Sequence, residues 1–139
     1  MKRLCELSKQ FAPLMGRILI SHIFIIAGFG KIMGFSRTAA YMASKDLPMT
    51  EVLLALTILV ELGGGLLILF GWKARWSALV IFLFLIPVTL IFHNFWTIQD
   101  AMARTHDMQA FMKNIAIMGA MLYILAYGSG PFSIGKDKC

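Results

Sequence analysis

Four long apolar runs constrain this chain more than any other feature of its sequence. A helix needs about 20 mostly apolar residues to cross the hydrocarbon core of a bilayer, and each run reaches that length. The runs lie at about 14–35, 50–71, 76–96 and 109–128, separated by segments that are polar or carry Pro and Gly. We therefore predict an all-α integral membrane four-helix bundle, with residues 1–139 forming one membrane domain.

Composition supports a membrane location and excludes two other classes of protein. The chain has 139 residues, of which 59% are hydrophobic and 14% charged, whereas a soluble domain is about 45–50% apolar and about 25% charged. A soluble protein of this size cannot bury so much apolar surface, so we expect the lipid bilayer to cover it. The net charge of +6 comes from basic residues in short clusters between the apolar runs. That pattern is typical of membrane proteins, and we predict no nucleic-acid partner.

The distribution of Lys and Arg predicts the orientation of the chain. The N-terminus, the second connection and the tail share one side of a four-span protein, and their basic residues are Lys2, Arg3, Lys9, Lys73, Arg75, Lys136 and Lys138. The other two connections hold only Arg37, Lys45 and Arg104, diluted by acidic residues. Because cytoplasmic connections carry the excess of Lys and Arg, we predict that both termini are cytoplasmic. The first run contains two basic residues and no A-x-A cleavage site, so we expect it to remain as a helix.

Five ionisable residues interrupt the apolar runs or lie at their edges, besides His22. They are Arg17, Lys31, Glu61, His93 and Lys113. A charge at the centre of a membrane helix costs about 2.5–3.5 kcal/mol to insert, and such residues usually face the bundle interior and mark a partner or a function. We predict a buried polar cluster in which Glu61 is paired with Lys31 and joined by His93, with Lys113 and Arg17 as further candidates.

The helical phase of each run predicts which residues face inward. At 100° per residue, the charged residue of each run lines up with small, hydroxyl or aromatic residues. The predicted inward stripes contain Arg17, Ser21, Phe24, Gly28, Lys31 and Phe35 in the first run; Thr50, Leu54, Thr57, Glu61, Gly65, Ile68 and Trp72 in the second; Phe82, Ile86, Thr89 and His93 in the third; and Lys113, Ala120 and Tyr127 in the fourth.

Depth along the helices places the charges relative to one another. With a rise of 1.5 Å per residue, Glu61 lies near the midplane, and Lys31, His93 and Lys113 lie about 7–10 Å toward the outer side. Arg17 lies about 12 Å toward the cytoplasmic side. His22 and His93 are about 15 Å apart along the membrane normal, so we predict no metal or haem site. The segment 105–107, with sequence Thr-His-Asp, falls in the third connection, and we interpret it as a solvated loop.

Glycines are concentrated beside the charged residues. Small residues let transmembrane backbones approach closely, and a close approach leaves less lipid around a buried charge. The glycines that we predict to pack helices are Gly28, Gly30 and Gly34 in the first run and Gly63, Gly64 and Gly65 in the second.

These motifs together resemble the DoxX family of small bacterial membrane proteins. The resemblance rests on "GRILISHIFIIAGFGKI", "YMASKDLP" and "ELGGGLLILFGWKAR", and it continues through "HNFW", "FMKNIAIMGAMLYIL" and the tail "GSGPFSI". The chain departs from the family pattern at Gly135, where relatives commonly carry Asp; here Asp137 comes two residues later. The resemblance implies a four-helix protein of the bacterial inner (plasma) membrane. The family takes its name from a subunit of a quinol oxidase, also described as a thiosulfate:quinone oxidoreductase, and other members are linked to a membrane redox complex.

Three hypotheses for function remain open at this point. The first is a membrane subunit or anchor of a redox or quinone-linked complex, with an oxidoreductase partner and quinone as the cofactor. The second is a small transporter or permeation unit, formed as a homo-oligomer and lined by the polar cluster. The third is a scaffold whose polar cluster only specifies helix packing. The sequence leaves open whether the chain is an enzyme, because it contains none of the soluble-enzyme motifs.

Overall fold

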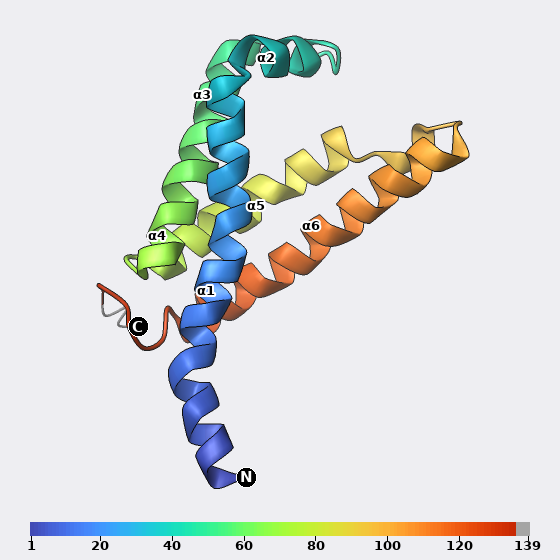
Figure 1. The fold of residues 1–139 in the computed structure, drawn as a ribbon. Coiled ribbons are helices and arrows are strands. Elements are labelled where there is room, and N and C mark those ends of the chain that lie inside the picture. Colours follow the sequence, from blue (N-terminus) through green and yellow to red (C-terminus); the bar gives the residue numbers. More distant parts are fainter. Residues whose placement is uncertain (136–139) are drawn as a thin grey trace.

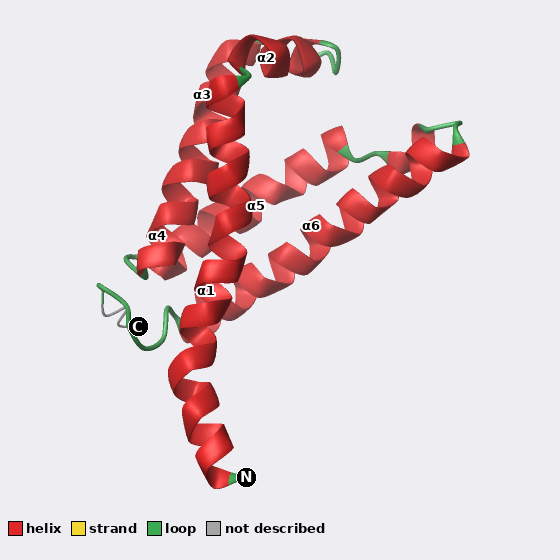
Figure 2. Ribbon diagram, in the orientation of Figure 1, coloured by secondary structure: helices red, strands yellow, loops and turns green. Residues whose placement is uncertain are grey.

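The structure, a computed structural model, describes residues 1–135, so Lys136, Asp137, Lys138 and Cys139 lie outside the described residues. Within these bounds every regular element is a helix (Figure 2). The α-helices are α1 (Lys2–Met33), α2 (Phe35–Ala43), α3 (Thr50–Ile58), α4 (Gly64–Phe70), α5 (Ala74–Phe92) and α6 (Ala101–Tyr127). A π-helical turn, η1 (Leu59–Gly63), joins α3 to α4, and a short 3-10 helix, η2 (Phe95–Thr97), follows α5.

Four continuous helical stretches are long and apolar enough to cross a membrane. They are Lys2–Met33, Thr50–Phe70, Ala74–Thr97 and Ala101–Tyr127, and they confirm the predicted number of spans. The first and fourth helices begin earlier than their apolar runs, and α1 continues through Pro13. Asp100 caps α6, its carboxylate accepting a hydrogen bond from the Ala103 N–H at 2.7 Å. The interpretation of 105–107 as a loop was therefore wrong, since these residues lie in α6.

The helices form two side-by-side pairs (Figure 1). α1 runs beside α3 and α4, α5 runs beside α6, and α4 also packs against α5. The start of α1 and the end of α6 lie at one end of the molecule, and the start of α1 extends beyond the other helices there. The α5–α6 connection and α2 lie toward the opposite end.

The short helix α2 lies across the end of α1 (Figure 1), where the sequence had suggested only a connection. It follows directly from Gly34, and its buried residues Ala39 and Met42 pack on Leu54 of α3. Thr38 Oγ1 donates a hydrogen bond to the Gly34 carbonyl at 3.0 Å, which ties the first turn of α2 to the end of α1. α2 therefore covers the C-terminal end of α1 and the N-terminal half of α3.

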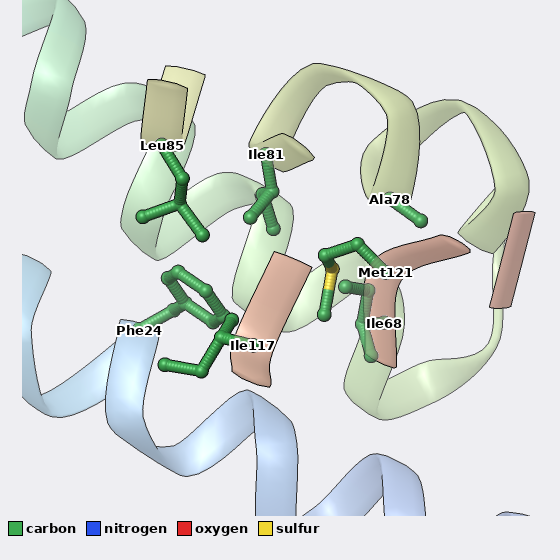
Figure 3. Packing of buried hydrophobic residues seen from close by; sticks show 7 residues of the cluster. All are labelled: Phe24, Ile68, Ala78, Ile81, Leu85, Ile117 and Met121. Carbon is green, nitrogen blue, oxygen red and sulfur yellow. The ribbon is translucent and has the colours of Figure 1, made fainter. Parts of the chain in front are cut away.

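A buried apolar cluster joins the two helix pairs. Figure 3 shows its seven side chains, which come from α1, α4, α5 and α6: Phe24, Ile68, Ala78, Ile81, Leu85, Ile117 and Met121. Because lipid is as apolar as these side chains, close packing rather than the exclusion of water holds such a cluster together in a membrane. The cluster fills the space between the helices below the polar residues that we describe next.

The predicted inward stripes are confirmed for the first two spans. In α1 the buried residues are Arg17, Ser21, Phe24 and Gly28. In the second span they are Leu54, Glu61, Gly65 and Ile68. Trp72 is the exception, because the chain leaves the helix at Gly71 and the indole is exposed.

The predicted stripe of the third span is confirmed at Thr89 but otherwise displaced, and the predicted stripe of the fourth span was wrong. α5 buries Ser77, Ala78, Ile81, Leu85 and Thr89, while Ile86 is exposed. α6 buries Asn114, Ile117 and Met121. The error has a physical cause, since both stripes were centred on charged residues. Lys113 and His93 lie at the edge of the buried face, where a long side chain or a helix end brings the charge inward.

Only three of the six predicted glycines make close packing contacts with another helix. A Cβ added at Gly28 would lie 3.0 Å from the backbone N of Leu62, one at Gly64 would lie 2.9 Å from Ile81 Cδ1, and one at Gly65 would lie 3.1 Å from Phe24 Cβ. Added at Gly30 or Gly63, it would meet nothing within 4 Å, and at Gly34 it would approach only Gly30 and Thr38. The packing role assigned to Gly30, Gly34 and Gly63 is thus corrected.

Gly28→Val should destabilise the protein, because the new side chain would press on the backbone of Leu62 and separate α1 from η1. Overpacking of this kind costs about 1–3 kcal/mol. Gly30→Val is the matched control on the same helix, since a Cβ there meets open space. Thermal unfolding of both variants in detergent measures the difference, and equal midpoints would contradict the packing role of Gly28.

The predicted orientation is tested by labelling Cys5, which is exposed near the start of α1. In a Cys139→Ser background, a membrane-impermeant maleimide should label Cys5 in inverted vesicles and leave it unlabelled in intact spheroplasts. A Cys5→Ser, Arg104→Cys variant should show the reverse, because Arg104 lies at the start of α6, at the opposite end. Labelling of Cys5 in intact spheroplasts would place the termini outside.

Candidate functional site

Glu61 lies in the π-helical turn η1, in the middle of the second span. A π-turn is rare, and in α-helices it is frequently found at functional sites. The turn ends at Gly63 and is followed by Gly64 and Gly65, and it packs against α1 where Gly28 allows the backbone of Leu62 to approach. The local sequence therefore places a carboxylate between two closely packed helices, with little room for lipid around it.

Lys31 and Glu61 form an ion pair, as the sequence predicted. The Lys31 Nζ donates a hydrogen bond to Glu61 Oε2 at 2.7 Å. The side chain of Glu61 is 10% exposed and that of Lys31 26% exposed, so the carboxylate is the more deeply buried partner. A short charge-assisted bond of this type fixes both side chains, and two of the three amine hydrogens of Lys31 remain for other acceptors.

His93 forms a second polar pair, with a residue that sequence reasoning missed. Its Nδ1 lies 3.0 Å from Asp107 Oδ1 in α6, and both side chains are partly buried. Oδ2 of Asp107 is buried and has no hydrogen-bond partner within residues 1–135. His93 ends α5, and its backbone N–H donates to the Thr89 carbonyl. Asp107 lies only two residues before the predicted apolar run that begins at about residue 109. This position could have indicated that the fourth helix begins earlier and includes Asp107.

Asn114 is a second residue that sequence reasoning missed. Its Nδ2 donates a hydrogen bond to Thr89 Oγ1 at 3.1 Å, and both residues are buried. The neighbouring Lys113 is exposed in the isolated chain but also contacts the interior cavity described below. The bond between Asn114 and Thr89 links α5 and α6 at the depth of that cavity.

A cavity of about 290 Å³ brings most of these polar residues together. It lies between α1, α2, the second span, α5 and α6. Its polar lining consists of Lys31, Glu61, His93, Lys113, Asn114, Thr38, Tyr41 and Thr57, and its apolar lining of Ile23, Phe24, Ala27, Met42, Phe84, Leu85, Val88, Phe92 and Ile117. Four of the five predicted cluster residues therefore border one cavity, although His93 pairs with Asp107 rather than with Glu61.

α2 closes one side of this cavity. The ring of Tyr41 packs against the ring of Phe92 at the end of α5, with 5.7 Å between the ring centroids. Phe24, Leu85 and Ile117 belong both to the cavity wall and to the apolar cluster in Figure 3. The cavity is thus bounded by α2 and aromatic rings on one side and by the apolar core toward the end that carries the termini.

Arg17 lies outside the cluster, and its predicted place there is corrected. It is 2% exposed, and its Nη2 donates to the carbonyl oxygens of Pro131 at 3.1 Å and Phe132 at 2.9 Å. It lies in the middle of α1, about 21 Å along the helix from Lys31, so it is too far from Glu61 for a shared site. Arg75 acts in a similar way, because its Nη1 donates to the carbonyl of Leu125 at 2.7 Å near the end of α6. Both arginines hold backbone carbonyls that lack helical partners.

Comparisons with known proteins identify the family of this chain. Residues 12–94, which include Lys31, Glu61 and His93, match the family DoxX. The chain belongs to the DoxX family. It is 38% identical to the inner membrane protein YqjF of Escherichia coli (strain K12) over 123 residues, covering 88% of each protein. It is 34% identical to the inner membrane protein YphA of the same organism over 124 residues, covering 88% of this chain and 87% of YphA.

This member of the DoxX family is accordingly a multi-pass inner-membrane protein. A shorter similarity connects it to a homolog of Surfeit locus protein 4 from Schizosaccharomyces pombe (strain 972 / ATCC 24843). That match is 29% identical over 73 residues, which are 52% of this chain and 24% of the yeast protein. No solved structure matches the chain.

Lys31→Met should destabilise this DoxX-family protein by about 1–3 kcal/mol, because the buried carboxylate of Glu61 would lose its partner. Glu61→Gln should cost less, since a neutral amide is easier to bury than a charge. The double variant should recover part of the loss, and unfolding of all four proteins in mixed micelles gives the coupling energy. Strictly additive losses would show that the two side chains do not stabilise each other.

Proposed function

We propose that the protein is the membrane subunit of a redox complex and that its cavity receives the headgroup of a quinone. The observation that carries the proposal is the cavity itself, because it places a carboxylate–lysine pair and a histidine beside aromatic rings within the membrane-spanning helices. Intramembrane ionisable residues usually mark a functional pathway or ligand site. Ligand sites are typically apolar pockets with a few polar groups that set orientation.

The lining residues fit a quinone head in size and in chemistry. The volume of about 290 Å³ is just below the usual range for ligand pockets, about 300–1,000 Å³, and is large enough for a ring-sized head. The rings of Phe24, Phe84 and Phe92 offer flat apolar surfaces for a quinone ring, and the free hydrogens of Lys31 can donate to one of its carbonyl oxygens. When bound, a quinone would supply the two-electron redox chemistry that no side chain in the cavity provides.

Glu61 and His93 would handle the proton that accompanies this chemistry. Glu61 Oε2 is held by Lys31, so its other oxygen is available to accept a hydrogen bond from a ligand hydroxyl. Asp107 orients the imidazole of His93 through Nδ1, a role that carboxylates commonly play for functional histidines. The two pairs lie on different helices that border the same cavity, so they would contact a ligand from different sides.

The permeation hypothesis has less support in the arrangement of the helices. A pathway through one chain would have to pass the apolar cluster of Figure 3, where Ile68, Ile81 and Met121 are fully buried. Close-packed side chains of that kind leave few voids that hold water. The scaffold hypothesis explains the ion pair, but it assigns no role to the cavity or to the His93–Asp107 pair.

Binding of a neutral short-chain quinone tests the proposal. The protein in nanodiscs should bind decylubiquinone saturably, as measured by calorimetry or by quenching of tryptophan fluorescence. Glu61→Gln should weaken binding of the reduced form, decylubiquinol, whose hydroxyl can donate to Glu61, about tenfold, the size expected for one lost hydrogen bond to a charged group. Glu51→Gln is the matched control, because Glu51 is exposed at the start of α3 and lies outside the cavity lining.

The redox partner needs a separate measurement. Isolation of the wild-type complex in a gentle detergent should yield quinone-dependent oxidoreductase activity, and Glu61→Gln should lose that activity while the partner still copurifies. A wild-type protein that shows no saturable quinone binding would contradict the proposal. If, in addition, the double variant Lys31→Met, Glu61→Gln were as stable as the wild-type protein and behaved normally in cells, the scaffold hypothesis would stand instead.

A further inference from the structure

One cation that borders the cavity has no ion-pair partner. Lys31 of α1 is paired with Glu61 of η1, and His93 at the end of α5 contacts Asp107 of α6. α2 contributes only the neutral polar residues Thr38 and Tyr41 to the lining. The remaining cation of the lining is Lys113 of α6, which forms no ion pair with any residue in the described part of the chain. No carboxylate of residues 1–135 therefore lies within ion-pair distance of this amine.

The position of Lys113 places its charge within a membrane span and at the cavity. Lys113 comes six residues after Asp107, so it lies about 9 Å further along α6 toward the interior. It is followed at once by the buried Asn114, which also lines the cavity and whose amide bonds to Thr89. A cation within a membrane span is expensive unless an anion or water compensates it. Because no carboxylate among residues 1–135 forms an ion pair with Lys113, an ionised oxygen of a bound molecule is a suitable partner for it.

We infer that the cavity binds an amphiphile whose head carries one ionised oxygen, with Lys113 as its counter-ion. The class comprises lipophilic carboxylates, such as fatty acids, and quinones that bear an acidic hydroxyl. The head would lie near Lys113 and Asn114, within reach of the free hydrogens of Lys31, and the ring or the first methylenes would contact Phe84 and Val88. A cavity of about 290 Å³ holds a head but no long chain, so the alkyl chain leaves through the open side.

This inference goes beyond the proposed function, since it does not require the ligand to be a quinone. It requires only that the ligand be anionic and lipophilic. A charge-assisted hydrogen bond is roughly twice as strong as a neutral one. The ionised form of a ligand should therefore bind more tightly than a neutral form of the same shape, and Lys113 should be the reason.

Matched acid and neutral probes test the inference. In nanodiscs of uncharged phosphatidylcholine, binding is measured for 2-hydroxy-3-undecyl-1,4-naphthoquinone and its 2-methyl ether, and for palmitic acid and its methyl ester. Each acid should bind the wild-type protein about tenfold more tightly than its neutral partner. Lys113→Met should bring this ratio close to one, and Lys113→Arg should keep it. Arg104→Met, which removes a positive charge from α6 outside the cavity lining, should leave the ratio unchanged.

The outcomes separate this inference from the proposed function. Equal binding of acid and neutral probes, or a ratio that survives Lys113→Met, overturns the inference and shows that Lys113 only reaches lipid headgroups. If palmitic acid binds through Lys113 and neither naphthoquinone nor decylubiquinone binds, the inference holds and the quinone proposal fails. If none of the probes binds the folded wild-type protein, both fail. Size-exclusion profiles of each variant confirm that it is folded.

Discussion

The carboxylate of Glu61 can remain among apolar helices only because the amine of Lys31 lies 2.7 Å from it. Several other features of the bundle follow from that contact. Gly28 lets η1 approach α1 closely enough for the two side chains to meet, and the π-turn gives the carboxylate its place in an otherwise regular span. Replacing both members of a buried ion pair by apolar residues often leaves the stability of a protein unchanged. Removing only one member strongly destabilises the protein. Lys31 and Glu61 therefore hold the first two spans together mainly because separating them would leave a buried charge without a partner. Their net attraction contributes less.

The two helix pairs create the cavity by the way they meet. The apolar cluster of Figure 3 joins them toward the end that carries the termini, while α2 spans the other end and reaches α5 through the contact of Tyr41 with Phe92. Polar side chains of five elements then border the same space. The arrangement separates two tasks, since the packed core provides rigidity and the cavity above it provides the polar chemistry. A site of this kind needs no soluble domain of its own.

Much of this fold follows from sequence patterns, and the failures have identifiable causes. The inward faces of α1 and of the second span were predicted because Arg17, Gly28 and Glu61 are buried themselves and so mark the face correctly. The same logic failed in α6, where Lys113 lies beside the buried face and Asn114 lies on it. Asp107 and α2 were missed because hydropathy treats any polar segment between apolar runs as a connection. The pairing of His93 with Asp107 depends on the end geometry of α5, which no periodicity reveals.

The contact of Arg17 with the tail has a consequence for the order of biosynthesis. Its guanidinium binds the carbonyls of Pro131 and Phe132, residues more than a hundred positions later, while the Ile134 N–H donates to Phe70 and the Gly135 N–H to Gly71. Gly71 has a left-handed conformation, and a Cβ there would lie 2.0 Å from Arg17 Nη1. These bonds can form only after the ribosome has released almost the entire chain. The Arg17 guanidinium, in the first helix to be made, thus gains these carbonyl partners only once residues 131 and 132 have been synthesised.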